Sequence, residues 1–386
     1  MSSLSRLLLP LLYPVLFLAL LLTLGVWSLR AFVDFSVSPQ AGFFNGKWAH
    51  AVESRYDEQF PLKRLGTNVW AALDYKLFNE GRPGVVLGRD GWLFSDEEFK
   101  LDAGAAKNID DNLRLIAGVR QYLARHNIRL VLAIVPAKAR LYREYLGERR
   151  PASAHDALYQ RFHRAARDSD IIAPDLLASL RLEAEAGTEQ GALFLRTDTH
   201  WTPHGADVVA HSIARAVHQQ GLLEVEPQVF VTDTAPAERF SGDLLRFLPL
   251  DPLFADWLPP PDGLQRRTTR PAVAGEAAGE DVLFADVQIP VALVGTSYSA
   301  NADWNFAGAL RQALGSDLVN YADSGQGPLP PMLNFLQSAE FTGAPPQLVI
   351  WEFPERYLPM AAELTKIDSE WLNQFRTSAA VAINAD

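Results

Sequence analysis

The chain has 386 residues, 48% of them hydrophobic, which is enough to bury one large core or two ordinary ones. Its formal net charge of -11 argues against a nucleic-acid-binding protein, because neutralising phosphates requires a basic face. The absence of cysteine excludes disulfide scaffolds, thiolate metal sites and cysteine nucleophiles.

An uncharged and almost wholly apolar run extends from Leu7 to Leu29. At about 1.5 Å per residue, a helix of this length would cross a hydrocarbon core of about 30 Å. No small-residue cleavage pattern follows it, which favours an uncleaved transmembrane anchor over a signal peptide. Arg6 and Arg30 flank the run almost symmetrically, but the short N-terminal tail favours a cytoplasmic N-terminus and export of the remaining chain.

Two features follow this run. Aromatic and apolar residues at helical spacing predict two amphipathic helices within residues 48–78, broken at Pro61. The segment Gly84–Phe94 predicts a β-hairpin whose turn is Arg-Asp-Gly. A glycine-rich phosphate-binding motif is absent from the sequence, so a phosphate site of that kind is not expected.

From Ile109 onward, helical and strand patterns alternate, which predicts an α/β fold with a mainly parallel sheet and helices on both faces. A short apolar piece, Ile171-Ile172, separates two of the helices. The predicted helices cover Ile109–His126, Tyr159–Arg167, Asp175–Ala186, Pro203–Gln219, Trp304–Leu314 and Pro330–Leu336. The predicted strands cover Ile128–Val135, Leu193–Leu195, Val291–Val294, Leu318–Ala322 and Leu348–Phe353.

The regular pattern weakens between Leu222 and Ile289, where prolines, alanine, glycine and charged residues dominate. This composition predicts an inserted small subdomain at about 222–289. The expected organisation is therefore a membrane anchor (1–35), N-terminal helices and a hairpin packed on the catalytic domain (36–100), the catalytic domain itself (101–360) and a C-terminal tail (361–386).

Asp198 and His200 stand two residues apart at the end of a short apolar run. In an extended segment such residues project from the same face, so the carboxylate can orient the imidazole as a general base. Ser297 follows the predicted strand Val291–Val294 and Gly295, where a tight turn would expose it as a nucleophile. We interpret Asp198, His200 and Ser297 as one catalytic constellation.

Other interpretations of these residues stay open on motif grounds. A bare Asp-x-His can be a surface loop with an ordinary hydrogen bond at a helix entry, and Ser299 is a rival nucleophile. A metal site would use Asp198, His200 and His204, but this spacing is not a standard one for zinc. Lys138, after the strand that ends at Val135, can bind a ligand or be a solvated lysine at a strand end.

Five segments carry a family resemblance: Thr197–Pro203 with Gly205-Ala206, Gly295–Ser299, Trp351–Tyr357, Gly91–Phe94 and Val135–Lys138. They resemble the alginate O-acetylation proteins AlgJ and AlgX, which have an SGNH-hydrolase-like fold. In that family the order of the SGNH motifs along the chain is permuted, so the Asp-x-His loop precedes the serine, as it does here. The similarity runs from about Gly46 to Leu358. The anchor and the lack of a C-terminal carbohydrate-binding module resemble AlgJ more than AlgX.

The resemblance implies Ser297 as the nucleophile that accepts the acyl group, His200 as its base and Asp198 as the orienting acid. An oxyanion also needs hydrogen-bond donors, for which we expect the amides of Ser297 and Tyr298 and the Gly325-Gln326-Gly327 segment. Arg356 can bind the acidic polymer, support the oxyanion, or form an ion pair with Glu352 or Glu355. Trp201 and Trp304 can stack on sugars or belong to the core.

The resemblance implies an O-acetyltransferase that modifies hydroxyls of an exported polysaccharide, with alginate as the expected polymer and no cofactor or metal. Because exported compartments lack acetyl-CoA, it also implies an MBOAT-type membrane partner that supplies acetyl groups, alongside other polysaccharide secretion proteins. The expected location is the inner membrane, with the catalytic domain in the periplasm. Two alternatives remain: a polysaccharide acetyl-esterase that uses the same three residues, and a non-catalytic scaffold of an acetylation complex.

Overall fold

The computed structural model describes residues 3–36, 45–60, 62–147, 153–187, 191–272 and 289–375; of residues 3–11, 31, 153 and 154 it describes only the backbone. The chain divides into two compact units. One contains residues 1–82 with 248–258, and the other contains residues 83–247 with 259–386.

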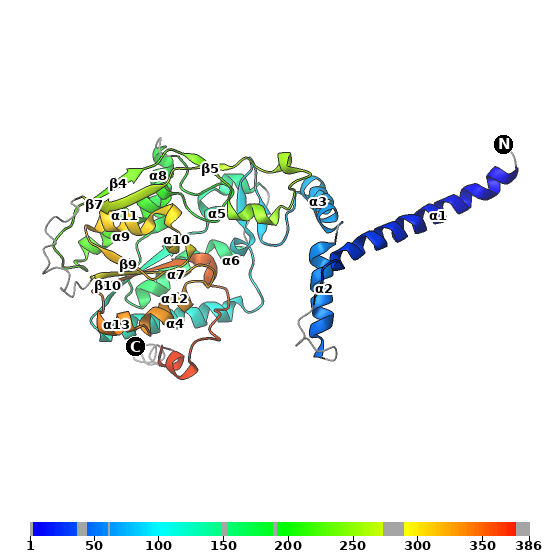
Figure 1. Ribbon diagram of the computed structural model, residues 1–386. Coiled ribbons are helices and arrows are strands. Elements are labelled where there is room, and N and C mark those ends of the chain that lie inside the picture. Colours follow the sequence, from blue (N-terminus) through cyan, green and yellow to red (C-terminus); the bar gives the residue numbers. More distant parts are fainter. Residues whose placement is uncertain are drawn as a thin grey trace. The chain divides into compact units, whose positions relative to one another are not determined.

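The smaller unit is helical and contains α1 (Ser3–Ser28), α2 (Lys47–Gln59) and α3 (Lys63–Leu73) (Figure 1). The two helices predicted within residues 48–78 are therefore confirmed. Among the residues that the structure describes, no helix is both long enough and apolar enough to cross a membrane. The transmembrane helix expected at Leu7–Leu29 is therefore not supported; the side chains of its first residues, 7–11, lie outside the described part.

The larger unit is organised around a four-stranded parallel sheet in the order β3, β10, β8, β9. In the register of the sheet, Leu132 of β3 lies opposite Trp351 of β10, which lies opposite Val294 of β8. The strands are β3 (Arg129–Val135), β8 (Val291–Val294), β9 (Leu318–Asn320) and β10 (Leu348–Pro354). The predicted parallel sheet is confirmed.

Helices cover both faces of this sheet, because its strands are apolar on both sides (Figure 1). Along β3, Leu130, Leu132 and Ile134 enter one core, and the residues between them enter the other. One core includes side chains of α4 (Ala105–Arg125), α7 (Leu158–Asp168), α12 (Leu329–Leu336) and α13 (Ala339–Gly343). The other includes side chains of α8 (Leu176–Ala186), α9 (Pro203–Gln219) and α11 (Phe306–Leu314).

Local sequence signals set several element boundaries. The Thr202 hydroxyl accepts a hydrogen bond from the Gly205 amide and Pro203 occupies the first turn, so α9 begins where the capping pattern predicts. The predicted hairpin is confirmed as β1 (Val85–Leu87) paired with β2 (Leu93–Ser95). Its turn places Asp90 and Gly91 at φ of 54° and 75°, a backbone region that glycine and aspartate tolerate.

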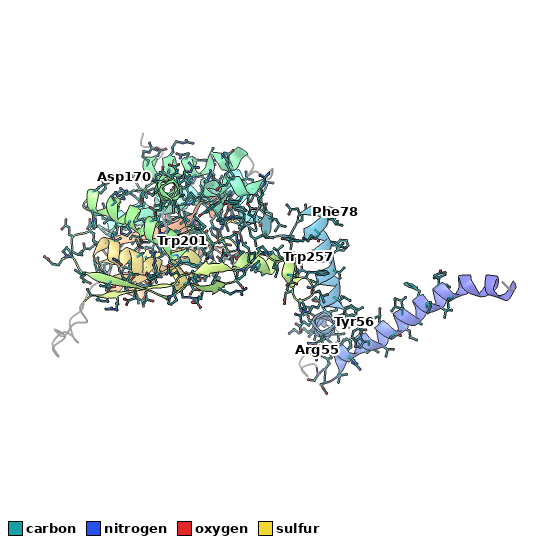
Figure 2. All side chains as sticks on the ribbon, turned by 90° about the horizontal axis from the view of Figure 1, so that it is seen from above. Arg55, Tyr56, Phe78, Asp170, Trp201 and Trp257 are labelled. Carbon is teal, nitrogen blue, oxygen red and sulfur yellow. The ribbon has the colours of Figure 1, made fainter. Side chains whose placement is uncertain are left out.

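Two expectations need correction. The strand predicted at Leu193–Leu195 makes only an isolated bridge, Phe194 to Trp201. The amide of Leu195 donates to the carbonyl of His200, so this segment folds back on itself and does not extend the parallel sheet. Trp201 is buried within the packed side chains of the unit, and Asp170 lies at its edge (Figure 2).

The separate subdomain expected at about 222–289 is not confirmed in the described residues, and 273–288 lie outside them. Residues 248–258 belong to the smaller unit and the remainder belongs to the larger one. The described strands of this segment form two antiparallel pairs, β4 with β7 and β5 with β6. Their bounds are β4 (Phe230–Thr234), β5 (Glu238–Phe240), β6 (Asp262–Leu264) and β7 (Arg267–Pro271).

The remaining described helices of the larger unit are short. They are α5 (Lys138–Leu141), α6 (Ser153–Asp156) and α10 (Ser297–Ala300). Both α5 and α10 begin just after the carboxyl ends of parallel strands, which is the edge where open α/β sheets place their ligands. The sheet therefore brings Lys138, Ser297 and the end of β10 to one edge.

Candidate active site

Ser297 is the first residue of α10, three positions after the end of β8. Thr296 precedes it as the N-cap, with a β-region backbone, and the Thr296 hydroxyl accepts a hydrogen bond from the Tyr298 amide at 3.4 Å. The strand, the glycine and the capped turn together present the Ser297 hydroxyl at the sheet edge, as the sequence pattern predicts.

The buried carboxylate of Glu352 fixes this turn through hydrogen bonds. Glu352 on β10 has 0% of its surface exposed and accepts hydrogen bonds from the Thr296 amide at 2.7 Å and the Thr296 hydroxyl at 3.0 Å. It also accepts a hydrogen bond from the Ser299 hydroxyl at 3.1 Å. Burial raises the pKa of Glu352, and the hydrogen bonds from Thr296 and Ser299 oppose that rise. Ser299, the rival nucleophile, is thus committed to a structural contact.

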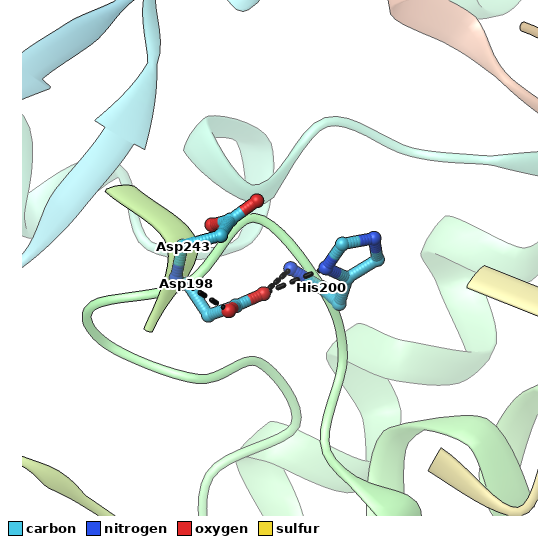
Figure 3. Close-up of side chains that lie close together, drawn as sticks. All are labelled: Asp198, His200 and Asp243. Atoms are coloured by element: carbon cyan, nitrogen blue, oxygen red, sulfur yellow. Dashed lines mark hydrogen bonds and ion pairs between the residues drawn. The ribbon is translucent and has the colours of Figure 1, made fainter. Parts of the chain in front are cut away.

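Asp198 and His200 meet in the loop between α8 and α9 (Figure 3). Oδ1 of Asp198 lies 2.6 Å from Nδ1 of His200 and accepts the His200 amide at 2.9 Å. The other carboxylate oxygen accepts the amide of Asp243 at 2.7 Å. Burial alone would raise the pKa of Asp198, but the hydrogen bonds from His200 and Asp243 hold it below its usual value. The carboxylate therefore remains charged at neutral pH.

The opposite side of the imidazole faces the serine. Nε2 of His200 lies 2.7 Å from Oγ of Ser297, across 97 residues of sequence. The ring stacks on Trp304, with centroids 5.2 Å apart, and contacts the Tyr298 ring at 4.7 Å. With Nδ1 turned to a carboxylate, Nε2 is free to accept the proton of a hydroxyl, which is the geometry of an oriented general base.

The main chain of this loop is held on both sides by groups from distant segments. Its amides are held by carboxylates: Asp262 accepts the amides of Arg196 and Thr197 at 2.9 Å each, and Asp243 accepts the Thr199 amide at 2.8 Å. The carbonyl of Thr199 accepts the Tyr298 hydroxyl at 2.8 Å. A loop without regular secondary structure is thereby fixed in place.

Of the roles considered for Arg356, the ion pair with Glu352 or Glu355 is not formed; its ion-pair partner is Glu97. Its Nε donates to Glu97 at 2.9 Å and its Nη1 donates to the Tyr298 hydroxyl at 3.1 Å. Only 6% of Arg356 is exposed, so its guanidinium supports the ring that contacts His200. Burial raises the pKa of Tyr298, which keeps its hydroxyl protonated as a donor.

Gln326 lies on the segment after β9, and its amide donates to Asp323. The amide of Asp323 in turn donates to the carbonyl of Gly295 at 3.2 Å, which ties this segment to the serine turn. Trp201 and Trp304 are buried, with 0% and 1% exposed, and so belong to the core.

The metal set of Asp198, His200 and His204 is not brought together, because His204 Nε2 instead lies 3.2 Å from Glu183. Within the described residues, the metal-ligand types that do cluster are Asp198, His200 and Asp243. In this cluster the Asp198 carboxylate accepts a hydrogen bond from His200, and the Asp243 carboxylate accepts one from the Thr199 amide.

Sequence reasoning missed two charged residues at this edge, Asp243 and Asp262, and it assigned Lys138 a different role. Lys138 is buried, with 1% exposed, and is neither a solvated lysine nor an open ligand-binding group. The only sequence signal for a buried role of Lys138 was its position directly after a buried strand, and this signal is weak. The two aspartates lie between Leu222 and Ile289, where the sequence carries no recognisable pattern.

A family model described as an SGNH hydrolase-like domain, acetyltransferase AlgX, matches residues 85–355, which is more than half of the chain. The chain belongs to this family. The resemblance to the AlgJ and AlgX proteins expected from the sequence is confirmed. The AlgX-type domain match covers the sheet, the Asp-x-His loop and the serine turn.

Individual members of the family are similar over almost the whole chain. A probable alginate O-acetylase AlgJ of Pseudomonas putida is 58% identical over 366 residues, which is 95% of this chain and 94% of the relative. A protein of the same name from Pseudomonas aeruginosa is 54% identical over 372 residues, with 95% and 94% covered. The solved O-acetyltransferase domain of Pseudomonas putida AlgJ is 56% identical, with a TM-score of 0.70, and covers 77% of this chain and 100% of that one.

Proposed function

We propose that this protein is an O-acetyltransferase that esterifies hydroxyls of alginate through an acetyl group carried on Ser297. The observation that carries the proposal is the 2.7 Å approach of His200 Nε2 to Ser297 Oγ, with Asp198 on the far side of the ring. The relatives named alginate O-acetylase supply the reaction and the polymer.

The proposed reaction has two halves. In the first, His200 takes the Ser297 hydroxyl proton as Oγ attacks the acetyl carbonyl carbon, and the donor's leaving group departs with that proton. In the second, His200 takes the proton of a polymer hydroxyl, which attacks the acetyl-serine; the ester passes to the polymer and Ser297 regains its proton. Asp198 holds the tautomer of His200 and stabilises the imidazolium in both halves.

Negative charge develops on the acetyl oxygen in both halves and requires donors. We propose the amides of Ser297 and Tyr298, at the start of α10, for this role. The Tyr298 amide would exchange its long, 3.4 Å contact with the Thr296 hydroxyl for the oxyanion. Gln326 remains a candidate oxyanion donor, because its segment contacts the serine turn through the hydrogen bond from the Asp323 amide to the Gly295 carbonyl. For Arg356 the contacts with Glu97 and Tyr298 favour a supporting role over direct contact with polymer.

We further propose that the protein acts outside the cytoplasm, at the inner membrane, with its catalytic domain in the periplasm. The apolar run Leu7–Leu29 is the sequence feature behind this proposal. An MBOAT-type membrane partner would then supply acetyl groups, beside other secretion proteins of the polymer. Carbonate extraction of membranes tests it: release of the protein with the soluble fraction would contradict membrane anchoring.

The decisive experiment supplies the purified protein with a chromogenic acetyl ester and unacetylated alginate oligomers. We expect acetyl esters on the oligomers. They should be lost in Ser297→Ala and retained in Ser299→Ala, because it is the Ser297 hydroxyl that lies beside His200, whereas the Ser299 hydroxyl donates to Glu352. Free acetate released at the same rate with and without oligomers would identify an esterase. Normal polymer acetylation in cells that produce Ser297→Ala would identify a scaffold.

A further inference from the structure

Lys138 begins α5 directly after β3, and 1% of its surface is exposed. Burying an ammonium is costly unless it is paired and hydrogen-bonded. Its Nζ donates to three main-chain carbonyls: those of Leu195 at 2.7 Å, Arg196 at 3.1 Å and Asp198 at 2.8 Å. All three donors of the ammonium are thus committed to the loop that carries the acid and the base.

The backbone on either side of Lys138 is also fixed. The amide of Ala137 donates to Glu355 at 2.6 Å, and the amide of Ala139 donates to Glu98 at 2.9 Å. Both carboxylates are buried, with 2% and 3% exposed. The lysine therefore projects from a rigid support, and its three contacts can transmit that rigidity to the loop.

The surroundings of Nζ combine aromatic rings and acidic groups. The rings of Trp92 and Phe94 lie 5.3 Å from Nζ, close enough for cation–π attraction. Burial lowers the pKa of Lys138 to about 8, and the attraction of nearby carboxylates opposes this effect. The carboxylates that face the ammonium are Glu98, Asp198, Asp262 and Asp243.

We propose that Lys138 is a positioning residue, whose buried ammonium holds the loop that carries Asp198 and His200. The proposal rests on the proposed function, because its consequence is the alignment of His200 with Ser297. Lys138 acts through main-chain carbonyls and does not touch the reacting atoms. When the ammonium loses its proton it retains two donors, so one of the three carbonyls loses its partner.

This arrangement has a consequence for the pH dependence. The three contacts are complete only below the pKa of Lys138, which is about 8. The acetyl-transfer rate of the wild-type protein should therefore fall as pH rises through that value. The folded protein itself should persist, because the lowered pKa means that the deprotonated form is less costly to bury.

The first test compares Lys138→Met, which keeps the length but removes the donors, with Lys107→Met, which removes an exposed lysine of α4. Acetyl transfer from a chromogenic acetyl ester is measured from about pH 6 to about pH 10. Lys138→Met should lose about 10²-fold in kcat, the cost of a misplacement of about 1 Å, with KM changed far less. Its residual activity should lack the fall near pH 8, and Lys107→Met should match the wild type.

A second variant decides the matter if Lys138→Met does not fold. Glu98→Gln keeps an oxygen for the Ala139 amide but removes the carboxylate charge that supports the ammonium. The fall in rate should then move to lower pH. If the rate of Glu98→Gln falls at the same pH as that of the wild type, the role of Lys138 is overturned. A Lys138→Met protein with the wild-type kcat and pH profile would also overturn it. A wild-type protein inactive on every acetyl donor would instead refute the proposed function.

Discussion

Gly295 shows how a single position controls the geometry of the nucleophile. A Cβ added there would lie 2.5 Å from Oε2 of Glu352 and 2.8 Å from its Cβ, closer than real Cβ contacts allow. Glu352 cannot retreat easily, because it also binds Thr296 and Ser299. The absence of a side chain at 295 thus lets the buried carboxylate reach the serine turn.

Gly295→Ala should therefore lower the free energy of unfolding by about 1–3 kcal/mol, the usual cost of overpacking a core. It should also reduce acetyl transfer, because the turn that carries Ser297 must shift. Gly343→Ala is the matched control, since nothing lies within 4 Å of its added Cβ. Urea denaturation and a rate assay measure the two effects; equal stability of both variants would contradict the steric argument.

At the scale of elements, the Asp-x-His loop owes its shape to other segments. Two aspartates beyond α9 hold its amides, while Lys138 and the Tyr298 hydroxyl hold its carbonyls. Asp243 and Asp262, which lie in the weakly patterned part of the sequence, therefore take part in building the site. Replacing one of these groups should lower the free energy of unfolding and also disturb the alignment of His200 with Ser297.

Asp262→Asn tests this at the loop. Asp262 accepts the amides of Arg196 and Thr197 on different oxygens, so asparagine leaves one of these amides facing its own NH₂ group. The expected cost is about 1–3 kcal/mol in the free energy of unfolding, with a lower kcat. Asp233→Asn, at an exposed ion pair with Arg270, should change stability by less than about 0.5 kcal/mol. Indistinguishable variants would show that Asp262 does not hold the loop.

Elements with long, periodic patterns were predictable from sequence, and those defined by tertiary contacts were not. The strand β3 and the helix α9 follow from apolar runs and capping residues. The three residues at Leu193–Leu195 are too few to distinguish a strand from a buried loop.

For the site, the Asp-x-His spacing and the serine turn named three residues that the structure places within hydrogen-bond distance, while their catalytic role remains a prediction. The burial of Lys138 depends on rings at positions 92 and 94, which no local pattern links to it.

At the scale of the larger unit, the sheet separates two cores. The Asp-x-His loop adjoins the core that contains Leu193, Phe194 and Trp201. The C-terminal residues Leu372 and Phe375 belong to the opposite core, which also contains side chains of α4. A substitution in the core that contains Phe375 should therefore lower the stability of the fold without disturbing the alignment of His200 with Ser297.

Phe375→Ala removes a side chain with 0% exposed and should lower the free energy of unfolding by about 3–5 kcal/mol. At a temperature where the variant remains folded, kcat should stay close to the wild-type value. Leu182→Ala, at a position 71% exposed, is the control and should be nearly neutral. A large loss of kcat in folded Phe375→Ala would show that the two cores are coupled to the site.

The covalent step is tested most directly by locating the acetyl group. Purified protein is mixed with a chromogenic acetyl ester in the absence of polymer, quenched with acid, digested and examined by mass spectrometry. We expect one acetyl group on Ser297, absent in Ser297→Ala and removed on adding alginate oligomers, which become acetylated. A protein that acetylates the oligomers while Ser297 never carries the acetyl group would contradict it.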